Sequence, residues 1–219
     1  MPLNQHATLL CSLPPLPVDF EQPHVPLSWP RMESRVRMLD PHEIKLLGTL
    51  QDFWRWEFAQ HSRQPTRLYE KLLEMSSGND GLRQCLMVLA DIRMLTVAVR
   101  AKAMEMRLDT AVGRWGDHVL RNWQVPDFGL SLRFPWLTDY GRHVEQNRYT
   151  EAERKACQVI WREMAHVADY HSFDLAAIIA YLVRWELISR WAARDGAAGR
   201  QRFNTLVEEA IGDYAGKID

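Results

Sequence analysis

Residues 89–102 read Leu-Ala-Asp-Ile-Arg-Met-Leu-Thr-Val-Ala-Val-Arg-Ala-Lys, an apolar helical pattern that a single carboxylate, Asp91, interrupts. Residues 180–191 (Ala-Tyr-Leu-Val-Arg-Trp-Glu-Leu-Ile-Ser-Arg-Trp) place Glu186 in a similar setting. An ionised carboxylate within an apolar face is costly unless it meets a cation. The two stretches therefore predict an all-α scaffold that buried or half-buried ion pairs hold together.

A third stretch, residues 50–57, echoes the second and ends in Glu57. Asp91 has no cation three or four residues further on, so its partner is expected on another helix or at the turn of Arg93. If the three acids occupy equivalent places in repeated helical units, they face a shared interior; the alternative is a coincidence of helix-rich composition. The candidate ion-pair residues are Glu57, Asp91, Arg93, Arg100 and Glu186.

The composition is that of a globular protein without a strong overall field. The 219 residues are 47% apolar and carry a formal net charge of −1, so charge favours neither nucleic acid nor an anionic membrane as a partner. Of the 27 cations 22 are arginines, which suit bidentate pairing with carboxylates, although genomic GC bias produces the same ratio.

Cysteine spacing and the length of apolar runs indicate the compartment. The three cysteines are far apart and lack metal-ligand spacing, which favours a reducing environment. The longest strongly apolar run, residues 175–183, is too short to span a bilayer, and the N-terminus lacks the basic region of a signal peptide. We expect a cytoplasmic protein, peripheral to the inner membrane only through a protein complex.

Prolines and capping signals divide the chain. Residues 1–30 hold seven of the eleven prolines and predict a proline-rich extended arm, with residues 6–13 as a short strand or packed strip. Asp40-Pro41-His42-Glu43 is a helix start, and Thr150-Glu151-Ala152-Glu153 is a second capping box. The expected helices cover residues 41–60, 65–75, 80–108, 110–123, 150–170, 173–194 and 197–214.

Residues 124–148 interrupt this pattern with two prolines and two glycines but remain rich in aromatic side chains. A loop this apolar is expected to pack against its own domain or against a partner. The predicted fold is an all-α multi-helix array with a helical domain at residues 31–219. This domain divides into two possible related units, residues 31–123 and 149–219, joined by the aromatic loop.

Glu163 and His166 form the one ExxH pair within an expected helix, which places two metal-capable side chains on one helix face. A di-iron bundle needs two such pairs and two further glutamates, so a surface or core histidine is the simpler interpretation. Neither a phosphate-binding loop nor a nucleophile triad is recognisable.

Residues 91–95 (Asp-Ile-Arg-Met-Leu) followed by residues 99–102 (Val-Arg-Ala-Lys) resemble a recurrent signature of the helical C/d subunits of V-type ATPases. Residues 180–186 resemble the Tyr-Leu…Glu helix of the same repeat. Residues 9–16 (Leu-Leu-Cys-Ser-Leu-Pro-Pro-Leu) are similar to the opening of an uncharacterised family encoded in bacterial V-type ATPase operons.

The sequence departs from the subunit pattern in two places. Met94 stands where the pattern has Asn, and Ser189 and Arg190 replace its Asn-Leu pair in the second unit. The length suits about two helical units, whereas the full subunit has three. The resemblance covers about half of the chain and implies a helical cup that seats the rotor shaft on the membrane ring, or helps to assemble that joint.

The resulting hypothesis is a non-enzymatic subunit or accessory factor of a bacterial V-type ATPase, without cofactor, nucleic-acid partner or membrane span. Its partners would be subunits of the central stalk or the membrane ring. The alternatives are a helical adaptor of another pathway and a metal-dependent helical enzyme that uses Glu163 and His166. The candidate partner-surface residues are Pro14, Pro15, Phe128, Phe134, Trp136 and Tyr140.

Overall fold

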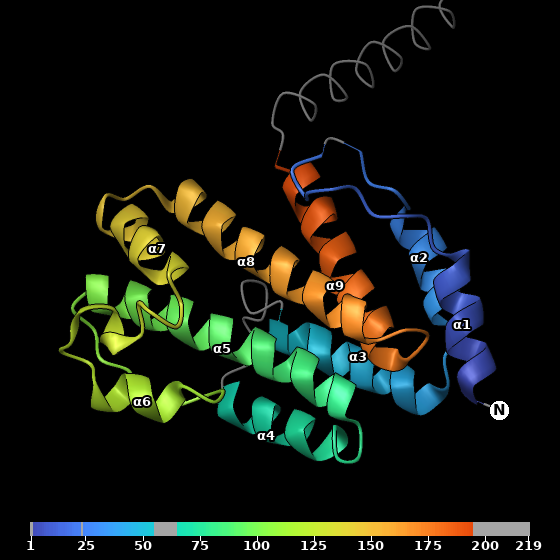
Figure 1. Cartoon of the computed structure of the whole chain (residues 1–219), viewed down its shortest axis with the longest axis horizontal. Coiled ribbons are helices and arrows are strands. Elements are labelled where there is room, and N and C mark those ends of the chain that lie inside the picture. Colours follow the sequence, from blue (N-terminus) through green and yellow to red (C-terminus); the bar gives the residue numbers. More distant parts are fainter. Residues whose placement is uncertain (1, 23, 55–64, 195–219) are drawn as a thin grey trace, which may run out of the picture.

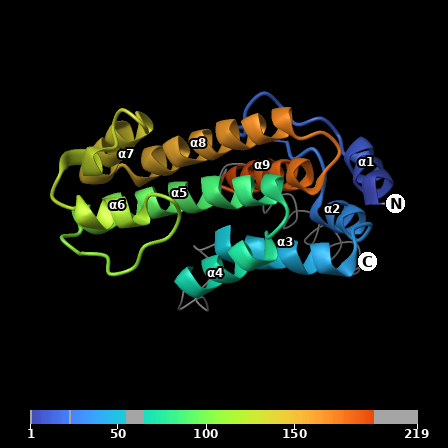
Figure 2. The same ribbon diagram turned by 60° about the horizontal axis from the view of Figure 1, so that its bottom comes forward.

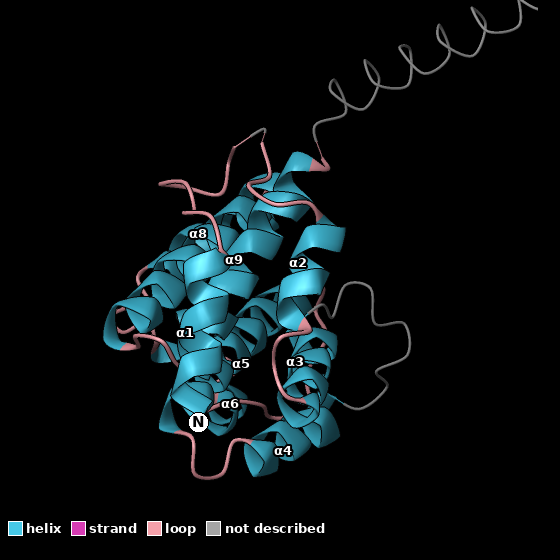
Figure 3. Cartoon of the chain, turned by 90° about the vertical axis from the view of Figure 1, so that its right-hand side faces the viewer, coloured by secondary structure: helices cyan, strands magenta, loops and turns pink. Residues whose placement is uncertain are grey.

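The computed structural model describes residues 2–22, 24–54 and 65–194. Within these ranges the chain forms nine α-helices, one short 3₁₀ helix and no strand, which confirms the predicted all-α class (Figures 1 and 3). The elements are α1 (Pro2–Ser12), α2 (Trp29–Val36), α3 (Pro41–Trp54), α4 (Pro65–Met75), α5 (Asp80–Ala103), α6 (Gly116–Arg121), η1 (Pro126–Gly129), α7 (Trp136–Glu145), α8 (Tyr149–Tyr170) and α9 (Leu175–Ala192).

The two longest helices, α5 and α8, form the frame of the molecule. They pack side by side, and α9 packs along α8 (Figures 1 and 2). α6 and α7 cover one end of this frame, and α1 to α4 lie toward the other (Figure 1). Asn79 caps α5 by accepting a hydrogen bond from the Leu82 N–H at 2.9 Å, and Asp174 caps α9 by accepting one from the Ala177 N–H at 3.0 Å.

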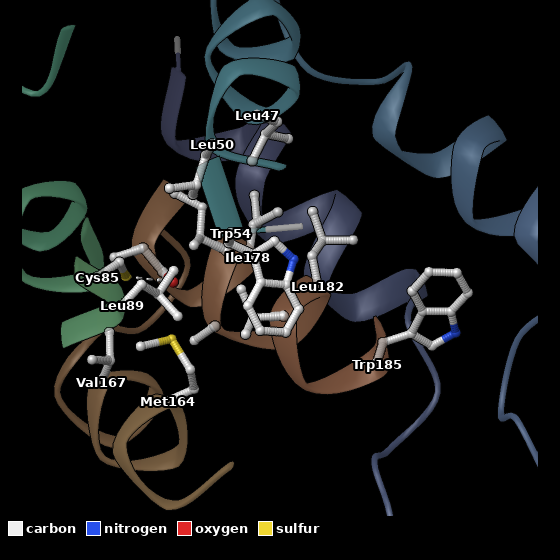
Figure 4. Close-up of a cluster of buried hydrophobic side chains, with 14 of the residues drawn as sticks. Leu47, Leu50, Trp54, Cys85, Leu89, Met164, Val167, Ile178, Leu182 and Trp185 are labelled. Carbon is white, nitrogen blue, oxygen red and sulfur yellow. Dashed lines mark hydrogen bonds between the residues drawn. The ribbon is translucent and has the colours of Figure 1, made fainter. Parts of the chain in front are cut away.

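A first hydrophobic core joins α1 to α5 with the second half of α8 and with α9. Leu50 and Trp54 of α3 meet Leu89 of α5, Met164 of α8 and Ile178 of α9 in it (Figure 4). Burying one large apolar side chain completely stabilises the fold by about 1.5–3 kcal/mol, so this cluster is a main source of stability.

A second core lies at the other end of the frame. Leu95 of α5, Val119 of α6, Phe128 of η1, Tyr140 of α7 and Val159 of α8 meet there. Because α5 and α8 each supply side chains to both cores, the boundary between the cores crosses these helices. The predicted division into units at residues 31–123 and 149–219 therefore does not correspond to the packing.

The N-terminal arm is partly helical, so its prediction as extended was wrong for two stretches. Pro2 is the first residue of α1, where its missing N–H costs nothing, and residues 3–12 contain no proline. Pro30 lies in the first turn of α2 for the same reason. Only the intervening part, residues 13–22 and 24–28, is irregular; we call it the N-terminal linker.

Residues 124–148 also differ from their prediction as a loop, because they contain η1 and the ten-residue helix α7. Pro135 precedes α7 and does not break it. Trp136, Leu137, Tyr140 and Val144 then follow at helical spacing and all face the second core. Pro135 therefore marks the start of a helix, and Gly141 lies buried inside that helix without interrupting it.

Helix boundaries were predicted with mixed success. The capping box at Asp40 is confirmed, since the Glu43 N–H donates to Asp40 Oδ1 at 2.9 Å and the Asp40 N–H donates to Glu43 Oε2 at 3.4 Å. The box at Thr150 was wrong, because α8 begins at Tyr149 after Arg148 without a side-chain cap. The helix expected at residues 65–75 is confirmed as α4.

The expected helices at residues 80–108 and 110–123 are shorter in the structure. α5 ends at Ala103, and Glu105 adopts a left-handed φ of +57°, so the chain turns there. The expected helix at residues 197–214 lies outside the described residues. In the described part of the chain, no helix has both the length and the apolar character needed to cross a membrane.

Candidate functional site

Asp91 lies near the middle of α5 and is 2% exposed. Arg114, in the loop between α5 and α6, contacts both oxygens of this carboxylate. Its main-chain N–H donates to Oδ1 at 2.7 Å, while its Nε and Nη2 lie 2.7 and 2.6 Å from Oδ2. This bidentate contact, strengthened by a backbone hydrogen bond, ties the loop to the helix.

Gly113 explains how the loop comes so close. Its φ of +79° is a left-handed conformation that glycine adopts without penalty. A Cβ atom at this position would lie 2.7 Å from Asp91 Oδ1 and 3.1 Å from the main-chain carbon of Ala90. Any other residue at position 113 would therefore push the loop away from the carboxylate.

The two members of the Asp91–Arg114 ion pair differ in burial, because the acid is buried and the arginine is partly exposed. Burial raises the pKa of Asp91 above its ordinary value, and the adjacent Arg114 opposes the rise. The Arg114 side chain remains 48% exposed and keeps part of its hydration. Because burial favours the protonated acid in the folded state, the stability contribution of Asp91 decreases as the pH rises above the ordinary carboxyl pKa.

The expected partner for Asp91, on another helix or at the turn of Arg93, was wrong, because the loop after α5 folds back along that helix. Arg93 donates a hydrogen bond to the carbonyl oxygen of Phe53, and its guanidinium lies 4.8 Å from the centre of the Phe53 ring. Burial lowers the pKa of Arg93 to about 10. Arg100 Nε donates to the Tyr140 hydroxyl at 2.7 Å.

Glu186 of α9 is 6% exposed and accepts a hydrogen bond from Trp54 Nε1 at 3.1 Å. This bond connects α9 to α3, whose residues are 132 positions away in the chain. Of the three carboxylates singled out from the sequence, Asp91 thus connects α5 to the loop that follows it, and Glu186 connects two helices that are distant in the chain. The third, Glu57, lies outside the described residues.

A cavity of about 50 Å³ lies where the two cores meet. Arg93, Arg100, Tyr140 and Arg190 contribute polar groups to its lining, together with Glu153. Typical small-molecule sites measure about 300–1,000 Å³, so this space suits water or a small ion at most. We interpret the cavity as a small gap left where the helices pack against one another.

An open groove of about 610 Å³ adjoins the cavity, and both are lined by Arg100 and Glu153. Met104 and Tyr149 form its apolar side. Glu153 forms an ion pair with Arg194, so charges within the groove are paired across it. The groove therefore combines an apolar wall with the Glu153–Arg194 ion pair.

The predicted partner surface at residues 124–148 was wrong for three of its four aromatic candidates. Phe128 is 1% exposed, Trp136 is 7% exposed, and Tyr140 is fully buried, because all three pack in the second core. Phe134 is half-buried and packs against the same core.

In the N-terminal linker, Pro14 is half-buried and Pro15 is exposed. The linker thus keeps an accessible edge of the predicted surface, whereas residues 124–148 contribute their aromatic side chains to the interior.

The possible metal ligands Glu163 and His166 lie on α8. Glu163 is half-buried and pairs with Arg162 at 3.2 Å, whereas His166 is exposed. No group of three potential metal ligands gathers anywhere in the part of the chain that the structure describes. The geometry therefore gives no support to a metal centre at this pair.

Reasoning from the sequence missed the two residues that satisfy the buried acids, Arg114 and Trp54. A Gly-Arg pair shortly after a helix with an interior acid could have pointed to Arg114, because glycine permits close approach. Nothing local links Trp54 to Glu186, since the two helices meet only in the folded chain.

No curated protein and no solved structure matches this chain. One family model does match, over residues 51–211, and it is described as a protein of unknown function (DUF2764). The matched segment contains the Asp91–Arg114 and Glu186–Trp54 contacts, the cavity and most of both cores. Because this match covers well over half of the sequence, the chain belongs to the DUF2764 family of proteins of unknown function.

Proposed function

We propose that the protein is a non-enzymatic helical subunit or assembly factor of a bacterial V-type rotary ATPase, where it joins the rotor shaft to the membrane ring through packed contacts. The proposal rests on the resemblance of residues 91–102 and 180–186 to the helical C/d subunits. The observation that carries it is the role of the acids in these motifs. Asp91 and Glu186 are buried and hold separate elements together.

The packing supports a role in transmitting force. α5 and α8 pass through both cores, so a load applied at one end of the frame reaches the other through continuous helices. Close-packed protein interiors compress little and transmit strain well. A protein that seats a shaft needs this kind of rigidity more than it needs a reactive site.

Affinity purification of the tagged protein from its own host, in gentle detergent and read by mass spectrometry, tests the proposal. We expect V-type ATPase subunits in fixed ratio to the bait if the protein is a permanent subunit, and in trace amounts if it is an assembly factor. A tagged helical protein of similar size serves as the control. Absence of these subunits, in cells that express the ATPase, would leave the helical adaptor as the better hypothesis.

A further inference from the structure

A second, larger hollow lies on the side of α5 and α8, next to the Asp91–Arg114 contact, and encloses about 150 Å³. Three parts of the chain surround it: residues 88–92 of α5, residues 133–136 at the start of α7 and residues 159–163 of α8. Its apolar lining comes from Val88, Ile92, Val159, Phe134, Pro135 and Trp136. We call this space the α5–α8 hollow.

The volume of the α5–α8 hollow limits what it can hold. Pockets for drug-sized molecules measure about 300–1,000 Å³, so a ligand of that size does not fit. An apolar cavity of about 150 Å³, engineered into another protein, binds benzene. The α5–α8 hollow therefore has room for a molecule with about one ring.

The aromatic wall of the hollow is fixed from behind by further rings. Phe134 packs edge-on against Trp115 with ring centres 5.7 Å apart, and against Trp136 with ring centres 6.3 Å apart. Trp136 in turn packs edge-on against Tyr140, which is fully buried in the second core. A wall that is already ordered costs little entropy when an apolar ligand binds to it.

The charged groups of the lining are three arginines and two acids. Asp91 is paired with Arg114 at 2.6 Å, and Glu163 is paired with Arg162 at 3.2 Å. The third arginine is Arg133, and within the part of the chain that the structure describes no carboxylate forms an ion pair with it. The lining therefore carries one more positive charge than negative charges.

Arg133 lies at the aromatic wall of the hollow. Its guanidinium is 5.9 Å from the centre of the Phe134 ring. A hydrogen-bonded turn holds both residues, because the N–H groups of Arg133 and Phe134 donate to the Leu130 carbonyl at 3.0 and 2.8 Å. A guanidinium binds a carboxylate through two parallel hydrogen bonds. An acid whose apolar body lies against the aromatic wall can therefore meet a cation at the same place.

We propose that the α5–α8 hollow binds a small organic monoanion, in which one carboxylate is joined to an apolar body of about one ring. The carboxylate pairs with Arg133, and the apolar body lies against Phe134, Trp136 and Val159. The inference does not depend on the proposed ATPase role, which rests on the burial of Asp91 and Glu186.

The charge balance of the lining favours a single negative charge. A phosphate dianion would leave one of its two charges without a matching cation, because Arg114 and Arg162 are already paired with acids. Nucleic acid and anionic lipid surfaces bind clusters of cations, whereas this lining has an excess of one. A carboxylate satisfies both the charge and the planar geometry of Arg133.

Titration calorimetry of the full chain with benzoate tests the proposal, and benzamide serves as a neutral probe of the same shape. We expect benzoate to bind with a Kd of about 1 mM or lower, and benzamide to bind at least about tenfold more weakly because it lacks the charged hydrogen bonds. Arg133→Gln should weaken benzoate binding about tenfold and leave benzamide binding unchanged.

The matched control is Arg107→Gln, which removes the same charge from an exposed arginine outside the lining of the hollow. Its benzoate affinity should equal that of the wild type. Because Arg133 is itself exposed, Arg133→Gln should keep the fold, and thermal melting of both variants checks this. An equal loss of affinity in both variants would reduce the effect to overall charge and overturn the site.

Amide NMR spectra of the full chain then locate the bound benzoate. The shifts that it changes should gather in residues 88–92, 133–136 and 159–163. The proposal fails if benzoate does not bind at about 10 mM, far above the expected Kd. It fails equally if benzamide binds as tightly as benzoate, or if the shifted amides lie elsewhere in the chain.

Discussion

The N-terminal linker and residues 124–148 look alike in the sequence and behave differently in the structure. Both contain prolines together with large apolar side chains, and residues 124–148 also contain two glycines. The linker remains irregular and buries mainly Phe20, whereas residues 124–148 build α7 and much of the second core. The linker is hydrogen-bonded to the surface of α8 and α9. Residues 124–148, in contrast, pack in the second core and help to hold α5 and α8 together.

The difference teaches that the position of prolines matters more than their number. Pro14, Pro15 and Pro17 follow one another closely, remove backbone donors and leave carbonyls for other side chains to bind. Pro126 and Pro135 stand at the start of η1 and just before α7, where they cost nothing. In the first case the tryptophans and tyrosine of α8 and α9 supply the missing donors.

The largest expected effect on stability comes from a substitution in residues 124–148, which pack in the second core. Phe128→Ala should lower the free energy of unfolding by about 3–5 kcal/mol, the usual loss for a buried phenylalanine. Phe128 also holds a left-handed φ of +55°, which its burial stabilises. Urea unfolding measures the loss. A loss below about 1 kcal/mol would show that residues 124–148 are not a structural part of the second core.

Phe20→Ala removes the anchor of the linker and should have a smaller global effect, about 2–3 kcal/mol, because the linker can be released without unfolding the helices. Amide hydrogen exchange in residues 13–22 should accelerate while exchange in α5 and α8 stays slow. If exchange accelerates equally in α5, the linker is as much part of the core as Phe128 is.

The two tyrosines allow a matched comparison, because Tyr→Phe removes one hydroxyl in each region. Tyr140→Phe removes a hydrogen bond with the charged Arg100 and should cost about 1.5–3 kcal/mol. Tyr181→Phe removes a bond to a neutral carbonyl of the linker and should cost about 0.5–1.5 kcal/mol. Urea unfolding of both variants decides the order, and a reversed order would contradict the assignment of core and linker.

Alkaline pH should weaken the linker contact. Burial raises the pKa of Tyr181 to about 12. An unfolded tyrosine loses its proton near pH 10, so the stability due to the protonated hydroxyl is full below about pH 10 and is lost as the pH rises to about 12. Tyr69, whose pKa burial also raises, contributes in the same range. The difference in unfolding free energy between wild type and Tyr181→Phe should therefore shrink between pH 8 and pH 11, and a constant difference would refute this.

The smallest effect is expected at the exposed tips of the two regions. Val18→Ser and Leu132→Ser should each change the free energy of unfolding by less than about 0.5 kcal/mol, because both side chains are almost fully exposed. Thermal melting compares them with wild type. A marked destabilisation by either substitution would mean that the exposed side chain supports the fold.

Much of the secondary structure could be predicted because its signals are local. The capping box at Asp40, the proline that begins α4 and the apolar spacing of α5 and α9 each lie at or within a few residues of the element they define. Where the prediction failed, in α1 and α7, the local signal was present but was outweighed by a count of prolines over a longer segment.

For the candidate site, the burial of the two acids could be predicted from the sequence, but the residues that bind them were not. The apolar setting of Asp91 and Glu186 showed that both carboxylates needed partners, and both are indeed buried and bonded. The partner of Glu186 could not be predicted, because Trp54 meets it only after α3 and α9 have packed. For Asp91, the Gly113-Arg114 pair after α5 was a local signal that the prediction did not use.

The residue pattern was enough to predict an array of helices with interior carboxylates that need hydrogen-bond or ion-pair partners. Only the packed structure shows that Arg114 and Trp54 meet those acids, and that Phe128, Trp136 and Tyr140 lie in the interior. Helix formation depends on neighbours within one or two turns, whereas the partners of the buried acids come from outside their helices: Arg114 lies 23 residues from Asp91, and Trp54 lies 132 residues from Glu186.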